Sequence, residues 1–207
     1  MASATMTALR QLDPIASSAA ILPDHRLAFN VPGTAFIEPS WASVEPVPVP
    51  VQQEEIQPMK KNSNNSNESI VVHGVLYKLT QEDFESVCQT EGVPFGYRLH
   101  RCQVIPYKGN DKDAGQIALT SSSPSSKSVP AFTLRAGRKI WRESRVDIPP
   151  SRAYRNVLVR GAKEFRIDRD YVNDLENIPV GRTLIGDGIA ENMLKAAELQ
   201  QQQRSDR

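Results

Sequence analysis

The chain has 207 residues, and its 25 basic and 24 acidic side chains leave a formal net charge of only +1. This near balance gives no electrostatic argument for binding nucleic acid or an anionic membrane surface. Cys88 and Cys102 are too few for a disulfide framework, and no run approaches the roughly 20 apolar residues of a membrane span. We therefore expect a soluble, cytoplasmic protein with one domain.

The first part of the chain predicts short extended segments. Strands are expected at residues 17–22 and 26–30, and Pro32 and Gly33 are expected to turn the chain after the second one. Residues 42–45 predict a further short extended piece. These segments are too short to decide the fold by themselves.

The segment 46–69, PVPVPVQQEEIQPMKKNSNNSNES, differs in composition from the sequence around it. Its alternating prolines favour an extended, polyproline-like chain, and its asparagine and serine tract cannot bury a core. We expect a disordered insertion in a surface connection. Near the start of the chain, residues 5–12 predict only a weak helix, because Asp13 and Pro14 end it early.

Residues 70–78, IVVHGVLYK, form the clearest predicted strand. They are apolar at nearly every position, which predicts burial on both faces. Gly74 in the middle of the run predicts a bulge or a close backbone approach. His73 beside it is interpreted as a packed or edge residue rather than as a ligand or a catalytic group.

A capped helix is expected to follow this strand and to end at Gly92. Thr80 is a suitable N-cap, and Gly92 suits the left-handed conformation that ends a helix. Phe84, Val87 and Cys88 fall at positions i, i+3 and i+4, which predicts one buried stripe. Cys88 is therefore interpreted as a core residue rather than as a nucleophile.

The rest of the chain predicts strands first and helices last. The expected strands cover residues 97–107, 117–119 and 129–134, and the expected helices cover residues 151–165, 170–177 and 188–203. This order predicts an α+β fold, or a small barrel with helices packed on one side. We expect one domain over residues 1–187, followed by a C-terminal helix and polar tail over residues 188–207.

Common catalytic and metal-binding motifs are missing from the sequence. It has no CxxC pair, no HExxH, no GxSxG and no glycine loop of the kind that holds phosphate. Its three histidines, His25, His73 and His100, are scattered without metal-ligand spacing. We expect no metal site and no cofactor.

Glu91 is the candidate catalytic residue, because it stands at the end of the predicted helix, directly before Gly92. The negative end of the helix dipole and the apolar residues that follow both disfavour the charged carboxylate, as a general acid or base near neutral pH requires. The alternative is a solvated glutamate at a fraying helix end. Spacing alone favours that alternative.

Three segments resemble the γ-glutamylcyclotransferase family: VHGVLYKLTQEDFESVCQTEGVPFGY, PSRAYRNVLVRGAKEF and LPDHRLAFN. The resemblance covers roughly residues 8–46 and 70–180. It implies that Glu91 is the catalytic acid/base, and that Tyr97 and Tyr154 contact the substrate or hold the site in place. It also implies a small mixed β-barrel flanked by helices, with no cofactor.

The reaction that this resemblance implies is the cyclisation of a γ-glutamyl amino acid, peptide or amine to 5-oxoproline, with release of the amine. The family opens with a Tyr-Gly-Ser-Asn loop that binds the substrate, and this sequence has no such motif. We interpret its start as misplaced or truncated. The alternative is a catalytically silent family member that serves as a binding module.

Overall fold

The computed structural model describes residues 12–34, 37–47, 71–121, 128–144, 146–181 and 183, and the structural statements below concern these residues. Three predictions lie outside the described residues. They are the weak helix before Leu12, the disordered insertion after Val47, and the C-terminal helix and polar tail after residue 187.

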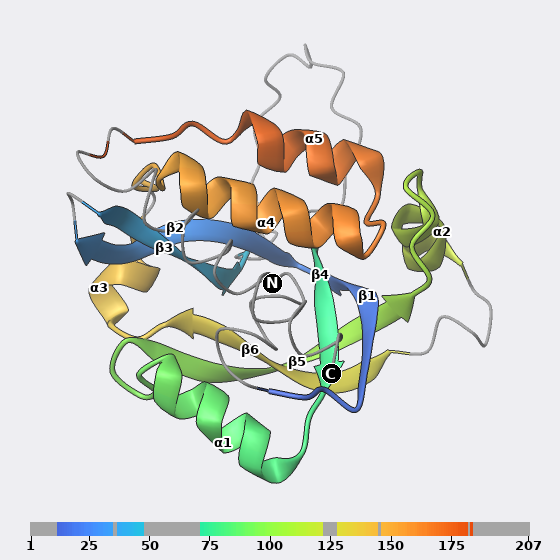
Figure 1. Ribbon diagram of the computed structural model, residues 1–207, viewed down its shortest axis with the longest axis horizontal. Coiled ribbons are helices and arrows are strands. Elements are labelled where there is room, and N and C mark those ends of the chain that lie inside the picture. The colour runs from blue at the N-terminus through green and yellow to red at the C-terminus, as the bar shows by residue number, and fades with distance from the viewer. Residues whose placement is uncertain are drawn as a thin grey trace, which may run out of the picture.

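The described strands form a curled four-stranded sheet and a separate two-stranded ribbon (Figure 1). The sheet has the order β4-β1-β5-β6, with β1 (Ala16–Pro23), β4 (Val71–Lys78), β5 (Tyr97–Tyr107) and β6 (Val129–Ala136). The ribbon pairs β2 (His25–Thr34) with β3 (Glu38–Pro46). A mixed barrel was predicted, whereas all pairings among the described strands are antiparallel.

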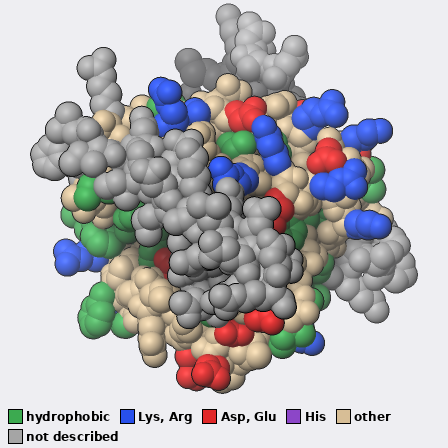
Figure 2. Space-filling model, viewed as in Figure 1, with side chains coloured by type: hydrophobic (Ala, Val, Ile, Leu, Met, Phe, Trp, Pro, Cys, Tyr) green, Lys and Arg blue, Asp and Glu red, His purple; other side chains and the backbone are tan. Residues whose placement is uncertain are grey.

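Helices lie on both sides of the curled strands, which confirms the predicted α+β class. The helices are α1 (Gln81–Thr90), α2 (Ala114–Thr120), α3 (Lys139–Arg142), α4 (Arg152–Glu164) and α5 (Arg169–Asn177). Figure 1 shows α4 and α5 together above the ribbon, and α1 on the opposite side below β5 and β6. On the face shown in Figure 2, basic and acidic side chains are interspersed over α4 and α5. None of the described helices is long and apolar enough to cross a membrane.

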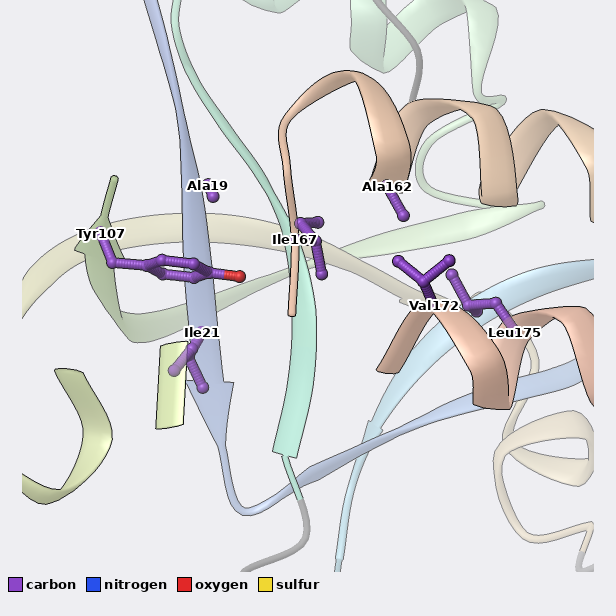
Figure 3. Close-up of a cluster of buried hydrophobic side chains, with 7 residues drawn as sticks. All are labelled: Ala19, Ile21, Tyr107, Ala162, Ile167, Val172 and Leu175. Atoms are coloured by element: carbon purple, nitrogen blue, oxygen red, sulfur yellow. The ribbon is translucent and has the colours of Figure 1, made fainter. Parts of the chain in front are cut away.

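The core is organised around β1, because its residues pack on both faces of the sheet. Ala19 and Ile21 join a cluster with α4 and α5, drawn in Figure 3, whereas Ala20 and Leu22 pack with residues of β4 and β5 on the other face. The prediction that residues 70–78 are buried on both faces is therefore wrong for most of β4. That strand lies at the edge of the sheet, where only Val72 and His73 are buried.

Local signals located the helix ends correctly. The hydroxyl of Thr80 accepts a hydrogen bond from the N–H of Asp83 at 3.1 Å, and the hydroxyl of Ser151 accepts one from the N–H of Tyr154 at 3.0 Å. Gly92 has φ +63°, as the predicted C-terminal cap requires. Both N-caps satisfy backbone donors that a helix start leaves unpaired.

Two predictions in the strands are wrong. The pairing of β1 with β4 is regular through Gly74, and open space surrounds the position of a Cβ there, so neither a bulge nor a close approach exists. Strand β2 continues through Pro32 and Gly33 to Thr34 because β3 pairs with it over that stretch.

The segment 117–119, predicted as a strand, lies within helix α2. The carboxylate of Asp168 accepts hydrogen bonds from the N–H groups of Gly115 at 2.8 Å and Gln116 at 2.9 Å. A side chain more than 50 residues away therefore caps this helix. Such a distant cap has no local sequence signal.

Candidate functional site

A β-bulge in the ribbon is the centre of the candidate site. Ala28 pairs with Ser43 and Val31 pairs with Trp41, so that two residues of β2 stand opposite Ala42 alone. A bulge of this kind interrupts the ladder of backbone hydrogen bonds. The N–H and C=O groups of Ala42 therefore need partners from outside the ribbon.

Tyr97 and Tyr154 supply these partners. The hydroxyl of Tyr97 donates to the carbonyl oxygen of Ala42 at 2.9 Å, and the hydroxyl of Tyr154 accepts from the N–H of Ala42 at 3.2 Å. Tyr97 is the first residue of β5 and Tyr154 lies in the first turn of α4. The structure thus brings together two of the three predicted site residues at a single residue of β3.

A buried carboxylate fixes the start of α4, and with it Tyr154. Glu38 is 5% exposed, and its two oxygens accept hydrogen bonds from the N–H of Ser151, at 2.8 Å, and from the Ser151 hydroxyl. The Tyr154 ring packs edge-on against Trp41, with ring centroids 5.1 Å apart. The N-cap that the sequence predicted is therefore itself held by β3.

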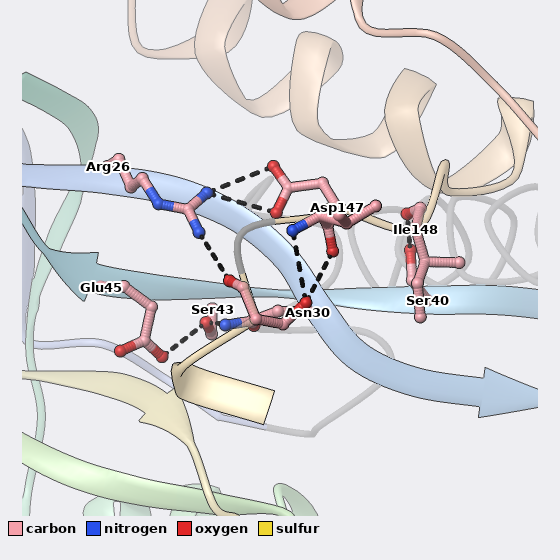
Figure 4. A network of polar contacts seen from close by, with 9 residues as sticks. Arg26, Asn30, Ser40, Ser43, Glu45, Asp147 and Ile148 are labelled. Atoms are coloured by element: carbon pink, nitrogen blue, oxygen red, sulfur yellow. Dashed lines mark hydrogen bonds and ion pairs between the residues drawn. The ribbon is translucent and has the colours of Figure 1, made fainter. Parts of the chain in front are cut away.

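A second buried carboxylate, Glu45, anchors the other side of the bulge (Figure 4). One of its oxygens accepts from Arg135 Nε at 2.9 Å and lies 2.8 Å from Arg135 Nη2. The other accepts from the N–H of Ala136 at 2.9 Å, and the Ser43 hydroxyl lies 2.9 Å from it. The Ser43 hydroxyl also lies 2.7 Å from Asn30 Oδ1, so its single proton serves one acceptor at a time.

Sequence reasoning missed Glu38, Glu45 and their partners. The buried positions of β3 include Glu38, Ser40, Ser43 and Glu45, which are all polar. A strand whose inward-facing positions are polar resembles an exposed strand when only its sequence is considered. Only the distant partners, Ser151 and Arg135, show that these side chains face inward.

A cavity of about 600 Å³ adjoins the bulge. Ala42 and Ser43 of β3 form part of its wall, and Phe84 and Val87 of α1 form another part. Its volume is within the usual range of small-molecule sites, roughly 300–1,000 Å³. The predicted burial of the α1 stripe is wrong, because Phe84, Val87 and Cys88 are all only half-buried and the first two face this cavity.

Glu91 lies on the same face of α1 as Phe84 and Val87. The three residues stand at positions i, i+3 and i+7, which share one helical face. Glu91 is the C-cap residue, and its N–H donates to the carbonyl oxygen of Val87 at 3.0 Å. The half-buried glutamate therefore stands one turn beyond the cavity wall.

A tight turn connects Glu91 to Tyr97. The N–H groups of Phe95 and Gly96 both donate to the carbonyl oxygen of Gly92 at 2.8 Å. The N–H of Gly137, just after β6, donates to the carbonyl oxygen of Gly96 at 2.9 Å. These hydrogen bonds fix the backbone of the segment that connects Glu91, the predicted acid/base, to Tyr97.

His73 is a packed residue, as the sequence indicated, whereas Cys88 is half-buried and not the core residue that was expected. The Nδ1 of His73 lies 2.9 Å from the Tyr107 hydroxyl, and its ring stacks on Tyr171 at 4.7 Å. Burial lowers the pKa of His73, and the nearby Asp168 carboxylate opposes this shift. Burial, with the Glu85 charge adding to it, raises the pKa of Cys88, so its thiol is protonated at neutral pH.

No group of three or more histidine, cysteine or acidic side chains within the described chain could hold a metal ion. Glu91 is the candidate that the sequence analysis singled out for acid/base chemistry. A single carboxylate at a cavity can accept a proton and return it, which is the requirement for acid/base catalysis.

Comparison with known proteins identifies the family of this chain. The AIG2-like family model matches residues 71–175, just over half of the chain. The γ-glutamyl cyclotransferase gliK of Claviceps purpurea (strain 20.1) is 28% identical over 180 residues, which cover 87% of this chain and 67% of that protein.

Two solved structures share the fold. The human protein loc79017 superposes with a TM-score of 0.60 at 18% identity, covering 94% of this chain and 92% of that one. A protein named γ-glutamyl cyclotransferase superposes with a TM-score of 0.59 at 17% identity, covering 93% of this chain and 94% of that one. Because the family model matches more than half of the chain and the structural likeness extends over nearly all of it, this chain belongs to the AIG2-like family and has the γ-glutamylcyclotransferase fold.

Proposed function

We propose that this protein is a γ-glutamylcyclotransferase that uses Glu91 as its general acid/base. The observation that carries the proposal is the position of Glu91 on the helical face that lines the 600 Å³ cavity. Ala42 forms part of the same cavity and is held by Tyr97 and Tyr154. The gliK relative, which is named as a γ-glutamyl cyclotransferase, supports the reaction class.

The proposed reaction needs one proton acceptor that later becomes a donor. The Glu91 carboxylate takes a proton from the α-ammonium group of the γ-glutamyl substrate. The freed amine nitrogen attacks the γ-carbonyl carbon, and a five-membered ring closes. The bond from that carbon to the leaving nitrogen then breaks, while protonated Glu91 gives its proton to this nitrogen. The regenerated carboxylate takes the second proton from the ring nitrogen and passes it to the released amine, which leaves as an ammonium group. The products are 5-oxoproline and the released amine.

Because the ring closes within one molecule, the main requirement for catalysis is the correct orientation of the reacting groups. The nucleophile and the carbonyl belong to the same substrate, so the protein has to hold a folded conformation rather than to bring two reactants together. We assign Tyr97 and Tyr154 to this task, through the wall that they hold at Ala42. Direct contacts of either hydroxyl with the substrate are compatible with the same role.

Release of 5-oxoproline from γ-glutamyl-alanine tests the proposed function. The full-length chain is incubated with the dipeptide, and both 5-oxoproline and alanine are quantified over time. Equal amounts of the two products are expected, without any added cofactor. Folded protein that releases neither product, from this dipeptide or from other γ-glutamyl peptides and amines, would contradict the proposal and favour a binding module.

Replacing either tyrosine at the bulge is expected to slow turnover. Tyr97→Phe and Tyr154→Phe each remove one hydrogen bond to Ala42, which costs about 1 kcal/mol of stability and shifts the cavity wall. We expect kcat to fall about tenfold or more, because small misplacements in a site slow reactions strongly. Steady-state kinetics well below the melting temperature of each variant measures this.

Tyr171→Phe is the matched control for these variants. It also removes a buried hydroxyl, but Tyr171 stacks on His73 in the core rather than at Ala42. Its kcat is expected to match that of the wild type. If all three variants lose turnover in proportion to their stability, the tyrosines at Ala42 have no positioning role.

A further inference from the structure

His25 and His100 face each other across the two sheets. His25 is the first residue of β2 and His100 lies in β5, 75 positions later in the sequence. Their Nε2 atoms are 3.2 Å apart, their ring centroids are 5.3 Å apart, and the ring planes are inclined by 50°. Their pairing could not be predicted, because their separation in the sequence matches no metal-ligand spacing.

The surroundings of His25 determine which of its nitrogens carries the proton. Its Nδ1 lies 2.7 Å from the carbonyl oxygen of Pro23. A carbonyl oxygen can only accept a hydrogen bond, so Nδ1 carries the hydrogen. In neutral His25 the Nε2 lone pair therefore accepts the hydrogen bond from the Nε2–H of His100 at 3.2 Å, and a metal ion would take the place of that proton. Histidines that bind metals in proteins almost always donate their other ring N–H to a carbonyl or carboxylate in this way.

We propose that His25 and His100 form a binding site for a divalent transition metal, with both Nε2 atoms as ligands. Imidazole ligands suit zinc, nickel and copper. With metal–nitrogen bonds of about 2.0–2.1 Å, the observed separation of 3.2 Å corresponds to an angle of about 100° at the metal. This angle is close to the tetrahedral value, so the separation of the two nitrogens suits a single ion.

The proposed site has two protein ligands and open positions. No third histidine, cysteine or acidic side chain of the described chain completes it, so water fills the remaining positions. Both rings are only half-buried, which leaves the nitrogens accessible to an ion from solution. The affinity is expected to be well below that of a four-ligand structural zinc site.

The charges near His100 do not prevent a cation from binding. Arg135 and Glu45 both act on His100 electrostatically, in opposite directions. They also form an ion pair with each other at 2.8 Å. Glu45 therefore offsets part of the repulsion that Arg135 exerts on a cation at His100.

A metal ion at this position would connect the ribbon to the four-stranded sheet. His25 belongs to the ribbon that carries the bulge at Ala42, and His100 lies three residues after Tyr97 in β5. The unfolded chain does not hold the two histidines together, so the ion binds the folded protein more tightly than the unfolded chain. The ion is therefore expected to raise the melting temperature. This inference does not depend on the proposed enzymatic activity.

Calorimetric titration of the untagged full-length chain with Ni²⁺, and separately with Zn²⁺, tests the site at pH 7.5 in a buffer that does not bind metals. We expect one ion per chain, and a rise in melting temperature that EDTA reverses. His25→Gln and His100→Gln are each expected to weaken binding at least tenfold. Both variants should keep the metal-free melting temperature within a few degrees, which shows that they fold.

Cys88→Ser is the matched control for this titration, because the half-buried Cys88 thiol is an alternative metal ligand. This variant is expected to bind both ions as the wild type does. Unchanged affinity in both histidine variants would overturn the proposal. So would the absence of binding to the wild-type chain at millimolar metal concentration.

Discussion

Glu91→Gln is expected to reduce 5-oxoproline release from γ-glutamyl-alanine by about 10²–10⁴-fold, the usual contribution of a general acid or base. Glutamine has nearly the size of glutamate, but it can neither take the proton from the substrate ammonium nor return it to the leaving nitrogen. The effect is expected in kcat, because the side chain is replaced and the cavity wall at Phe84 and Val87 remains.

Loss of the fold would not explain this result. Glu91 is the C-cap residue of α1, where a negative charge meets the negative end of the helix dipole. Removing that charge is expected to leave stability unchanged or to raise it slightly. A thermal melt beside the kinetic assay therefore separates loss of catalysis from loss of structure.

Glu82→Gln provides the matched control. Glu82 is an exposed glutamate in the first turn of the same helix, so the substitution is chemically identical and lies away from the cavity. We expect wild-type turnover from this variant. Equal turnover by Glu91→Gln and the wild type would show that another group transfers the proton.

The sequence predicted those parts of the fold whose signals are local. Thr80 and Ser151 cap their helices through a hydrogen bond to a residue three positions later, and Gly92 ends α1 by its own backbone conformation. Each of these signals lies within one turn of the feature that it determines. The positions of β1, β4 and β5 followed for the same reason, since runs or alternations of apolar residues mark them.

Features that depend on distant partners could not be predicted. Helix α2 begins where the Asp168 carboxylate meets its N-terminal N–H groups, and segment 117–119 alone resembles a strand. Tyr97 and Tyr154 both form hydrogen bonds with the backbone of Ala42. The methyl side chain of Ala42 gives no sign of this role in the sequence. Its role follows from a bulge in the pairing of β2 with β3, and pairing cannot be read from one strand.

The family resemblance identifies candidate site residues, whereas the structure shows how these residues are positioned. The resemblance named Glu91, Tyr97 and Tyr154 as site residues. In the structure both tyrosines bond to Ala42, which lines the cavity together with Phe84 and Val87 of α1, and Glu91 follows one turn later on that helical face. The proposed site depends on this arrangement, and the kinetics of the Glu91, Tyr97 and Tyr154 variants test it.

Glu45→Gln is expected to destabilise the protein by about 2–3 kcal/mol, because the buried carboxylate accepts hydrogen bonds that a neutral amide can only partly replace. The Glu45 side chain is 4% exposed and its oxygens meet Arg135, Ala136 and Ser43. The NH₂ group of a glutamine there would face another donor, either the Arg135 guanidinium or the Ala136 N–H, and could not accept a hydrogen bond from it. The measurement is urea unfolding at pH 7, with the slope of the transition compared between the variant and the wild type.

Glu176→Gln is the control for that measurement. Glu176 forms an ion pair with Lys163 at 2.6 Å, but the side chains are 60% exposed for Lys163 and 44% exposed for Glu176. Exposed pairs contribute only about 0–1 kcal/mol, because water screens both charges. A loss for Glu45→Gln no larger than that for Glu176→Gln would mean that the pair with Arg135 does not hold the ribbon. A clearly larger loss, with kcat also reduced, would show that the buried carboxylate stabilises the bulge on which the tyrosines act.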